Sequence, residues 1–277
     1  MELRITILAE NSVVVPFDVI GEHGFSAFIE TPDFNFLFDT GQGKALLNNA
    51  IALKKDLASI KFLYISHGHY DHVGGIVDLL KVKRPIETYA HPDIFSNRYW
   101  SLGNVRRYIG IPFCQSYLES LGVKFNFHKE FKEIEKGIFS SGEVERKTAF
   151  EKIDKEMKVE SSSGELVQDN IWDDFSLGID TPKGLVIILG CAHAGIINIL
   201  NHFINKTGKK EIYAVIGGTH LGFASEQQIN SVLEVIEKYN IQKLGASHCT
   251  GLEVGAKLYN KLKDKFFFAS VGSVFEL

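Results

Sequence analysis

The chain has 277 residues, of which 45% are hydrophobic and 23% are charged, and its formal net charge is −4. This balance is typical of a globular protein that can bury a full core. It provides no basic stripe for phosphates, and no apolar run reaches the roughly 18 residues that span a bilayer. We therefore expect a protein that binds neither nucleic acid nor membrane.

The chain starts with a predicted strand over residues 1–8, which lacks the basic end, long apolar core and cleavage site of a signal peptide. Its three cysteines, Cys114, Cys191 and Cys249, are far apart and odd in number, unlike a disulfide framework. Both observations favour a reducing cytoplasm as the location.

Two segments of the chain resemble each other, and each predicts a β-hairpin. Residues 25–41 and 175–191 both contain an apolar strand, a Thr-Pro turn and a second apolar strand that ends in a Gly-containing loop. A helical pattern follows each hairpin, and a further strand and helix follow that. The pattern favours two similar halves, each a sheet covered by helices, and a chance similarity of two hairpins is the alternative.

Residues 83–168 do not fit this repeat. Their first part has strand-like aromatic segments, and residues 129–165 are dense in Lys and Glu. We predict one domain whose core pieces are 1–82 and 169–277, with an inserted subdomain over about 83–168. A solvated charged helix with loops is the alternative for the second part of this stretch.

The most informative motif comes directly after the predicted strand 61–66. It reads H-x-H-x-D-H and places His67, His69, Asp71 and His72 within six positions. Such a loop can direct the first two histidines at one metal ion and the last two residues at a second. Neutral imidazoles and a carboxylate suit zinc, iron or manganese. The motif therefore predicts a metal site.

Further ligands must come from the ends of other strands. His193, His220 and His248 each follow a predicted strand and lie in a loop of small residues. We predict that His193 and His248 bind metal directly, and that His220 is either a ligand or a neighbour of one.

For two other residues at strand ends, the sequence allows more than one role. Asp39 ends the matching strand of the first half, where it can orient a ligating imidazole or form the turn. Cys191 can bind zinc or iron, or be a buried thiol. His23, just before the first hairpin, is a candidate to line the site.

Taken together, these motifs resemble the metallo-β-lactamase superfamily, and the resemblance implies an α/β fold of the four-layer αββα sandwich type. Several short segments resemble those of the branch of dihydropterin ribofuranosylaminobenzene phosphate synthase-like proteins. They surround His23, the H-x-H-x-D-H motif, His193, His220, His248 and the segment 141–146. Some relatives carry a ferredoxin-like insertion, which is the expectation for residues 83–168.

The chain departs from the hydrolytic members of that superfamily at two places. Those members have a His before the second hairpin and a bridging Asp after it, whereas this chain has no His in 170–174 and reads Gly190-Cys191 at the second position. The bridging carboxylate is therefore missing, or replaced by His193 or Cys191. One full and one weak metal site are compatible with this change. His69 in place of Glu argues against the flavodiiron branch.

The resemblance implies a metal-dependent enzyme that acts on a small anionic or pterin-like molecule. One or two divalent metals are expected, zinc first, with iron or manganese as alternatives. The reaction would be hydrolysis, or a condensation in which a phosphorylated aminobenzene displaces a group on a dihydropterin. Asp71 is the candidate catalytic residue, and His23 and Arg146 are candidates to contact substrate. A metal-binding or sensory module and an iron redox protein are the competing hypotheses. The sequence makes no prediction of oligomeric state.

Overall fold

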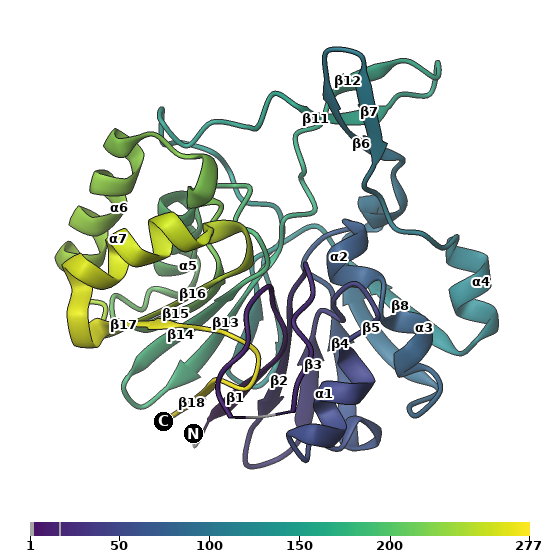
Figure 1. Cartoon of the computed structure of the whole chain (residues 1–277), viewed down its shortest axis with the longest axis horizontal. Helices are drawn as coiled ribbons and strands as arrows, with labels where there is room; N and C mark the ends of the chain where they lie inside the picture. Colours follow the sequence, from purple (N-terminus) through teal and green to yellow (C-terminus); the bar gives the residue numbers. More distant parts are fainter. Residues whose placement is uncertain (1–2, 17) are drawn as a thin grey trace.

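The computed structural model describes residues 3–16 and 18–277. Two seven-stranded sheets face each other, and helices cover the outer face of each sheet (Figure 1). This arrangement confirms the predicted four-layer αββα sandwich.

The first sheet has the strand order β18-β1-β2-β3-β4-β5-β8. The neighbours from β18 to β3 pair antiparallel, and those from β3 to β8 pair parallel. Its strands are β1 (Arg4–Ala9), β2 (Ser26–Glu30), β3 (Asn35–Phe38), β4 (Ile60–Tyr64), β5 (Ile86–Ala90), β8 (Val123–Phe127) and β18 (Val274–Glu276). The helices beside it are α1 (Leu46–Ala52), α2 (Tyr70–Val73), α3 (Ile76–Leu79) and α4 (Gln115–Ser120).

The second sheet repeats this plan in the order β17-β16-β15-β14-β13-β10-β9. Its neighbours pair antiparallel from β9 to β14 and parallel from β14 to β17. Its strands are β9 (Lys132–Glu135), β10 (Ile138–Ser140), β13 (Ser176–Thr181), β14 (Gly184–Leu189), β15 (Ile212–Gly218), β16 (Lys243–Ser247) and β17 (Phe266–Phe268). Helices α5 (Ile196–Thr207), α6 (Glu226–Lys238) and α7 (Leu252–Leu262) cover it. The shared order of pairings agrees with the internal repeat expected from the two hairpins.

The core has three layers because both faces of each sheet are buried. In β4, Phe62 and Tyr64 point between the sheets, whereas Leu63 packs under the helices of the first half. In β14, Ile188 points between the sheets and Ile187 packs under α5 to α7. Strands buried on both faces are continuous apolar runs, which is why these segments lack polar alternation.

The predicted extent of the insertion is wrong. Strands β5 and β8 complete the first sheet, and β9 and β10 complete the second. Only β6 (Arg98–Leu102), β7 (Val105–Tyr108), β11 (Met157–Glu160) and β12 (Leu166–Gln168) form a separate antiparallel sheet, which we call the small sheet; it stands beyond the edge of the sandwich (Figure 1). Among the described residues the small sheet includes no helix, so it is not ferredoxin-like. Residues 129–165 likewise form strands and loops instead of a charged helix.

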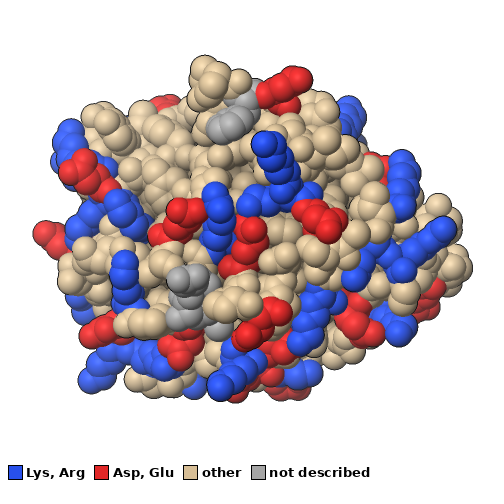
Figure 2. All heavy atoms as spheres, turned by 90° about the horizontal axis from the view of Figure 1, so that it is seen from below, with Lys and Arg blue, Asp and Glu red and all other residues tan. Residues whose placement is uncertain are grey.

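On the face seen from below, basic and acidic side chains alternate (Figure 2). Within the described part of the chain, no helix combines the length and the apolar character needed to cross a bilayer. All three cysteines are free thiols.

Candidate metal centre

The candidate ligands lie in loops that follow parallel strands of both sheets. The H-x-H-x-D-H motif follows β4 and continues into α2, His193 follows β14, and His248 follows β16 and begins the 3₁₀ helix η4 (His248–Thr250). The carboxyl ends of parallel strands meet at one edge of a sheet. Because the two sheets face each other, the ligand loops of the two halves meet in one centre.

His67, His69 and His193 form the first cluster. His67 Nε2 lies 3.0 Å from His69 Nδ1. One nitrogen of each of the three rings lies within 4.8 Å of the others, and all three residues are buried. Three imidazoles at such separations are the ligand set of many zinc sites.

The chemistry of the first cluster fits a cation. His69 faces His67 through Nδ1, and His193 Nε2 is buried and has no hydrogen-bond partner. Burial lowers the pKa of His69 to about 3, and burial also lowers the pKa of His67 and His193 well below the ordinary value. The three rings are therefore neutral at pH 7, which is the form that binds a metal.

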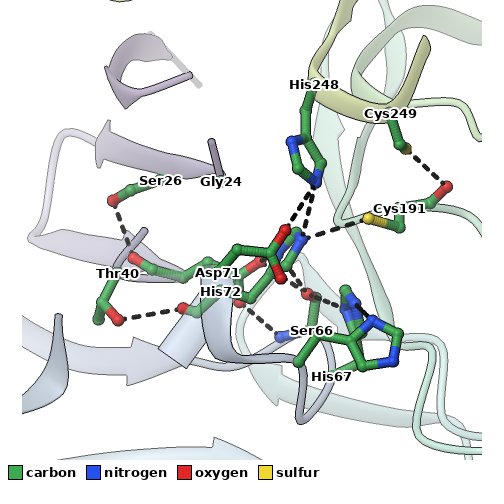
Figure 3. Close-up of polar contacts among 12 residues, drawn as sticks. Gly24, Ser26, Thr40, Ser66, His67, Asp71, His72, Cys191, His248 and Cys249 are labelled. Carbon is green, nitrogen blue, oxygen red and sulfur yellow. Dashed lines mark hydrogen bonds and ion pairs between the residues drawn. The ribbon is translucent and has the colours of Figure 1, made fainter. Parts of the chain in front are cut away.

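Asp71, His72, Cys191 and His248 form the second cluster (Figure 3). His72 Nε2 lies 3.2 Å from Cys191 Sγ and 3.3 Å from His248 Nε2. His248 Nε2 lies 3.3 Å from Asp71 Oδ2. Two imidazoles, a thiol and a carboxylate thus converge from loops of both halves, and this donor set suits zinc or iron.

Asp71 controls the charge of the second cluster. Burial alone would raise the pKa of Asp71, but hydrogen bonds from His23 and His248 hold that pKa well below its usual range. Burial alone would lower the pKa of His248, but the hydrogen bond to Asp71 raises it to about 9. Without metal, Asp71 is therefore ionised and His248 carries a proton at neutral pH. A bound cation would take the place of that proton.

Three of the imidazoles are oriented in the same way. Each is hydrogen-bonded through Nδ1 to a neighbouring oxygen, so its Nε2 is left for a ligand. The pairs are His67 with Ser66 Oγ (2.9 Å), His72 with Asp39 Oδ2 (2.7 Å) and His248 with Asn11 Oδ1 (3.1 Å). Asp39 also accepts the Ser66 hydroxyl hydrogen at 2.6 Å, so one carboxylate positions a ligand of each cluster. The orienting contact expected for Asp39 is present.

Cys191 lies between the two clusters. Its Sγ groups with His67 and His72 in one potential ligand set, and with His248 and Cys249 in another. Burial raises the pKa of the Cys191 thiol. Of the two residues expected to replace the bridging carboxylate, the structure places Cys191 between the clusters, whereas His193 belongs to the first.

The remaining candidates lie around the clusters. His23 contacts Asp71 Oδ2 through Nε2 at 3.1 Å, and its side chain is 54% exposed. His220 packs behind His193, with 4.5 Å between the ring centres. Arg146 lies over the Trp172 ring at 5.3 Å and donates from Nη2 to the Asn170 carbonyl at 2.6 Å, whereas its Nε is buried without a partner.

Sequence reasoning missed the two aspartates before β13. Asp173 accepts a hydrogen bond from Gly68 N–H at 2.8 Å, and Asp174 accepts one from Ala194 N–H at 2.8 Å. Each carboxylate thus holds one ligand loop. The sequence contains one indication of this role, because the two acidic residues are adjacent and directly precede a buried strand. We used their loop, residues 170–174, only for its lack of a His. Gly68 is required there because a Cβ would collide with the Ile94 carbonyl.

Asp173 also connects the centre to the small sheet. Arg98 of β6 is almost fully buried and binds Asp173 with both terminal nitrogens at 2.7 Å. Its Nε donates to Asp169 at 2.8 Å. The H-x-H loop is therefore held, through one carboxylate, by an arginine of a different sheet.

Comparisons with known proteins identify the family of this chain. The family model of the metallo-β-lactamase superfamily matches residues 19–195. The 7,8-dihydropterin-6-methyl-4-(β-D-ribofuranosyl)-aminobenzene-5'-phosphate synthase of Methanocaldococcus jannaschii is 30% identical over 98% of this chain and 96% of its own length. An uncharacterised protein of the same organism is 33% identical over 98% of both chains.

Solved structures show the same relationship. Tm1679, a metal-dependent hydrolase of the β-lactamase superfamily, superposes with a TM-score of 0.85 at 28% identity over 99% of both chains. YhfI of Bacillus subtilis, a metallo-β-lactamase fold protein, superposes with a TM-score of 0.58 at 11% identity over 100% of this chain and 99% of its own, which shows the fold alone. The chain therefore belongs to the metallo-β-lactamase superfamily.

Proposed function

We propose that this protein is a metal-dependent enzyme that acts on a small anionic or pterin-like substrate. The observation that carries the proposal is the pair of adjacent clusters, in which His193 Nε2 is buried without a partner. A buried polar group left unpaired costs roughly 1–3 kcal/mol, which a bound cation would offset. The full-length similarity to a pterin-related synthase supports the same proposal.

The two clusters would hold one metal ion each. His67, His69 and His193 would bind the first, and Asp71, His72, His248 and Cys191 the second. The thiol favours zinc or iron over manganese, because thiolates select softer cations. When bound, such an ion supplies Lewis-acid polarisation of a substrate oxygen.

His23 is the residue of the centre that is both exposed and held in place. Asp71 accepts the Nε2 hydrogen of His23, which leaves Nδ1 as the nitrogen that can accept a proton. We assign to His23 the uptake of the proton that a nucleophile loses during the reaction. Asp71 remains ionised and fixes the orientation of His23.

We assign to this chain the class of reaction that its synthase relative's name implies. An aromatic amine of a phosphorylated ribofuranosyl aminobenzene would form a bond to the 6-methyl carbon of a dihydropterin. The group on that carbon would leave with the bonding electron pair, and the amine would lose a proton to His23. The name of the relative describes a product that contains both of these parts.

The test is turnover by the zinc-loaded protein. It is incubated with a dihydropterin that carries a leaving group on its 6-methyl carbon and with 4-(β-D-ribofuranosyl)-aminobenzene 5'-phosphate, and the product is detected by mass spectrometry. We expect product from the parent, and none after chelation or in a His67→Ala, His69→Ala variant. A metal-loaded parent that forms no product would contradict the synthase assignment.

Hydrolysis is the second candidate, because Tm1679 is a hydrolase of the same superfamily with the same overall structure. The same zinc-loaded samples are therefore assayed with phosphodiester, ester and lactone substrates. Hydrolysis without condensation would replace the synthase assignment with a hydrolase. Two bound metals without any turnover would identify a metal-binding module.

A further inference from the structure

A cavity of about 610 Å³ lies between the small sheet and the beginning of α6. This volume is within the range of small-molecule sites. Trp100 and Met157 of the small sheet line one side, and Phe223 and Gln228 line the other. Residues 152–156 line it as well. The cavity is therefore formed jointly by the second half of the sandwich and by the small sheet with its adjoining loop, which lie outside the two repeated halves.

The cavity adjoins the first cluster through His220. His220 lines the cavity, and its ring centre lies 4.5 Å from that of His193. On the other side, the ring centre of His220 lies 5.6 Å from that of Phe223. A continuous series of aromatic rings thus leads from a candidate metal ligand into the cavity. A molecule bound there would lie beside the candidate metal centre.

The wall of the cavity presents large apolar side chains that the fold does not bury. Trp100 and Met157 are direct partners in the antiparallel pairing of β6 with β11, so they lie on the same face of the small sheet. Leu102 is on that face two residues further and is 55% exposed. Phe223, on the opposite side, is 79% exposed. Exposed aromatic and aliphatic surfaces on two sides of a cavity are suited to a flat ring.

The charges of the lining are balanced. Lys152 and Lys155 alternate with Asp154 and Glu156, so this segment carries no net charge. Such a lining does not attract a polyanion, and the amides of Gln227 and Gln228 add neutral hydrogen-bonding groups. The cavity therefore fits a flat ring with polar edges better than a phosphate chain.

We propose that this cavity binds the heteroaromatic ring of the substrate between Trp100 and Phe223. The ligand class is a flat, uncharged heteroaromatic ring with hydrogen-bonding edges, such as a pterin. The identification of this ring as the substrate rests on the proposed function. Binding of the ring itself requires no metal. Trp100, Met157 and Phe223 would then determine specificity without taking part in the chemistry.

The test is calorimetric titration of the full chain with 6-methylpterin, before and after removal of metal by a chelator. Phe223→Ala and Trp100→Ala are compared with Tyr117→Ala, an exposed aromatic residue of α4 outside the cavity. Ribose 5-phosphate is the anionic probe without a heteroaromatic ring. Phe223 is mostly exposed, so its variant keeps the fold, which circular dichroism checks.

We expect 6-methylpterin to bind the parent and Tyr117→Ala equally. Each of the other two variants should bind it about fivefold or more weakly, which is the usual effect of losing one stacking partner. Unchanged affinity in both variants, absence of binding to the parent, or equal binding of ribose 5-phosphate would overturn the inference.

Metal content measured on the same samples separates the two proposals. Pterin binding by a parent that takes up no metal when zinc is supplied would refute the proposed function and leave this inference intact. Metal-dependent turnover with an unchanged pterin KM in both variants would overturn this inference alone.

Discussion

Asp39 is the residue on which the orientation of both clusters depends. It is fully buried, accepts a hydrogen bond from His72 Nδ1 and accepts another from Ser66, whose hydroxyl contacts His67. The sequence allowed two roles for Asp39, orienting an imidazole or forming the turn, and its contacts with His72 and Ser66 are those of the first role. Asn11 orients His248 in a comparable way, but nothing near Asn11 in the sequence points to a residue 237 positions away.

Replacing Asp39 with Asn should weaken metal binding while the fold is retained. Oδ2 of Asp39 accepts from His72 and from the Ser66 hydroxyl, and Oδ1 accepts from the Ser66 N–H. An amide has only one oxygen and would place its NH₂ group against one of these donors, and loss of such an orienting contact typically lowers metal affinity about 10- to 100-fold. Competition with a chromophoric chelator measures the affinity. The control is Asp180→Asn, whose carboxylate contacts Lys209 at the surface. Equal affinities in the two variants would contradict the role of Asp39.

The second cluster should bind metal more tightly as pH rises from 7 to 9. The pKa of His248 is raised to about 9, so below that pH a metal must displace a proton from it. The metal must also displace the proton of the Cys191 thiol, whose pKa is raised by burial, so affinity should rise by up to about 100-fold per pH unit to pH 9 and by about tenfold per unit above it. The first cluster, whose pKa values are lowered, should show no such dependence over this range. Zinc titrations at several pH values, with proton release followed by an indicator, test both statements.

Among the elements, the small sheet is attached to the candidate metal centre by a buried ion-pair network. Arg98 of β6 contacts Asp173 and Asp169, and Asp173 also holds the H-x-H loop. The sequence could not reveal this, since Arg98 and Asp173 are 75 positions apart and neither lies in a motif. The same limitation explains the misassigned insertion. Local apolar patterns identified segments such as 86–90 as strands, but the sheet that a strand joins depends on contacts distant in the sequence.

Replacing Arg98 with Met should destabilise the fold strongly. It removes one partner and leaves two carboxylates buried, an effect of about 3–5 kcal/mol on the free energy of unfolding. Urea denaturation measures this change. Arg106→Met, on the neighbouring strand β7 and exposed, is the control and should change stability by less than about 0.5 kcal/mol. A loss below about 1 kcal/mol for Arg98→Met would show that the network is dispensable.

In the molecule as a whole, the candidate metal centre lies where the two halves of the sandwich meet. His67, His69, Asp71 and His72 come from the first half, and Cys191, His193 and His248 come from the second. The repeat of hairpins and the strand-end histidines together allowed this meeting point to be predicted from the sequence. The small sheet and the cavity beside it lie outside the repeat, and no sequence pattern located them.

Removing metal should therefore lower the thermal stability of the whole domain. A ligand that binds only the folded state stabilises it by about 2.7 kcal/mol when its free concentration is 100 times Kd. For a chain of this size, that corresponds to a Tm lower by several degrees after chelation. Scanning calorimetry measures the shift, which should be much smaller in the His67→Ala, His69→Ala variant. The same Tm with and without chelator in the parent would mean that metal does not link the halves.

The most direct test of the binuclear centre is the metal content per chain, measured by plasma mass spectrometry on zinc-loaded protein after removal of free metal. The parent should hold two equivalents. His193→Ala and His248→Ala should each hold about one, because each removes a ligand of a different cluster. One equivalent or less in the parent, or a parent-like content in both variants, would contradict the two-cluster centre.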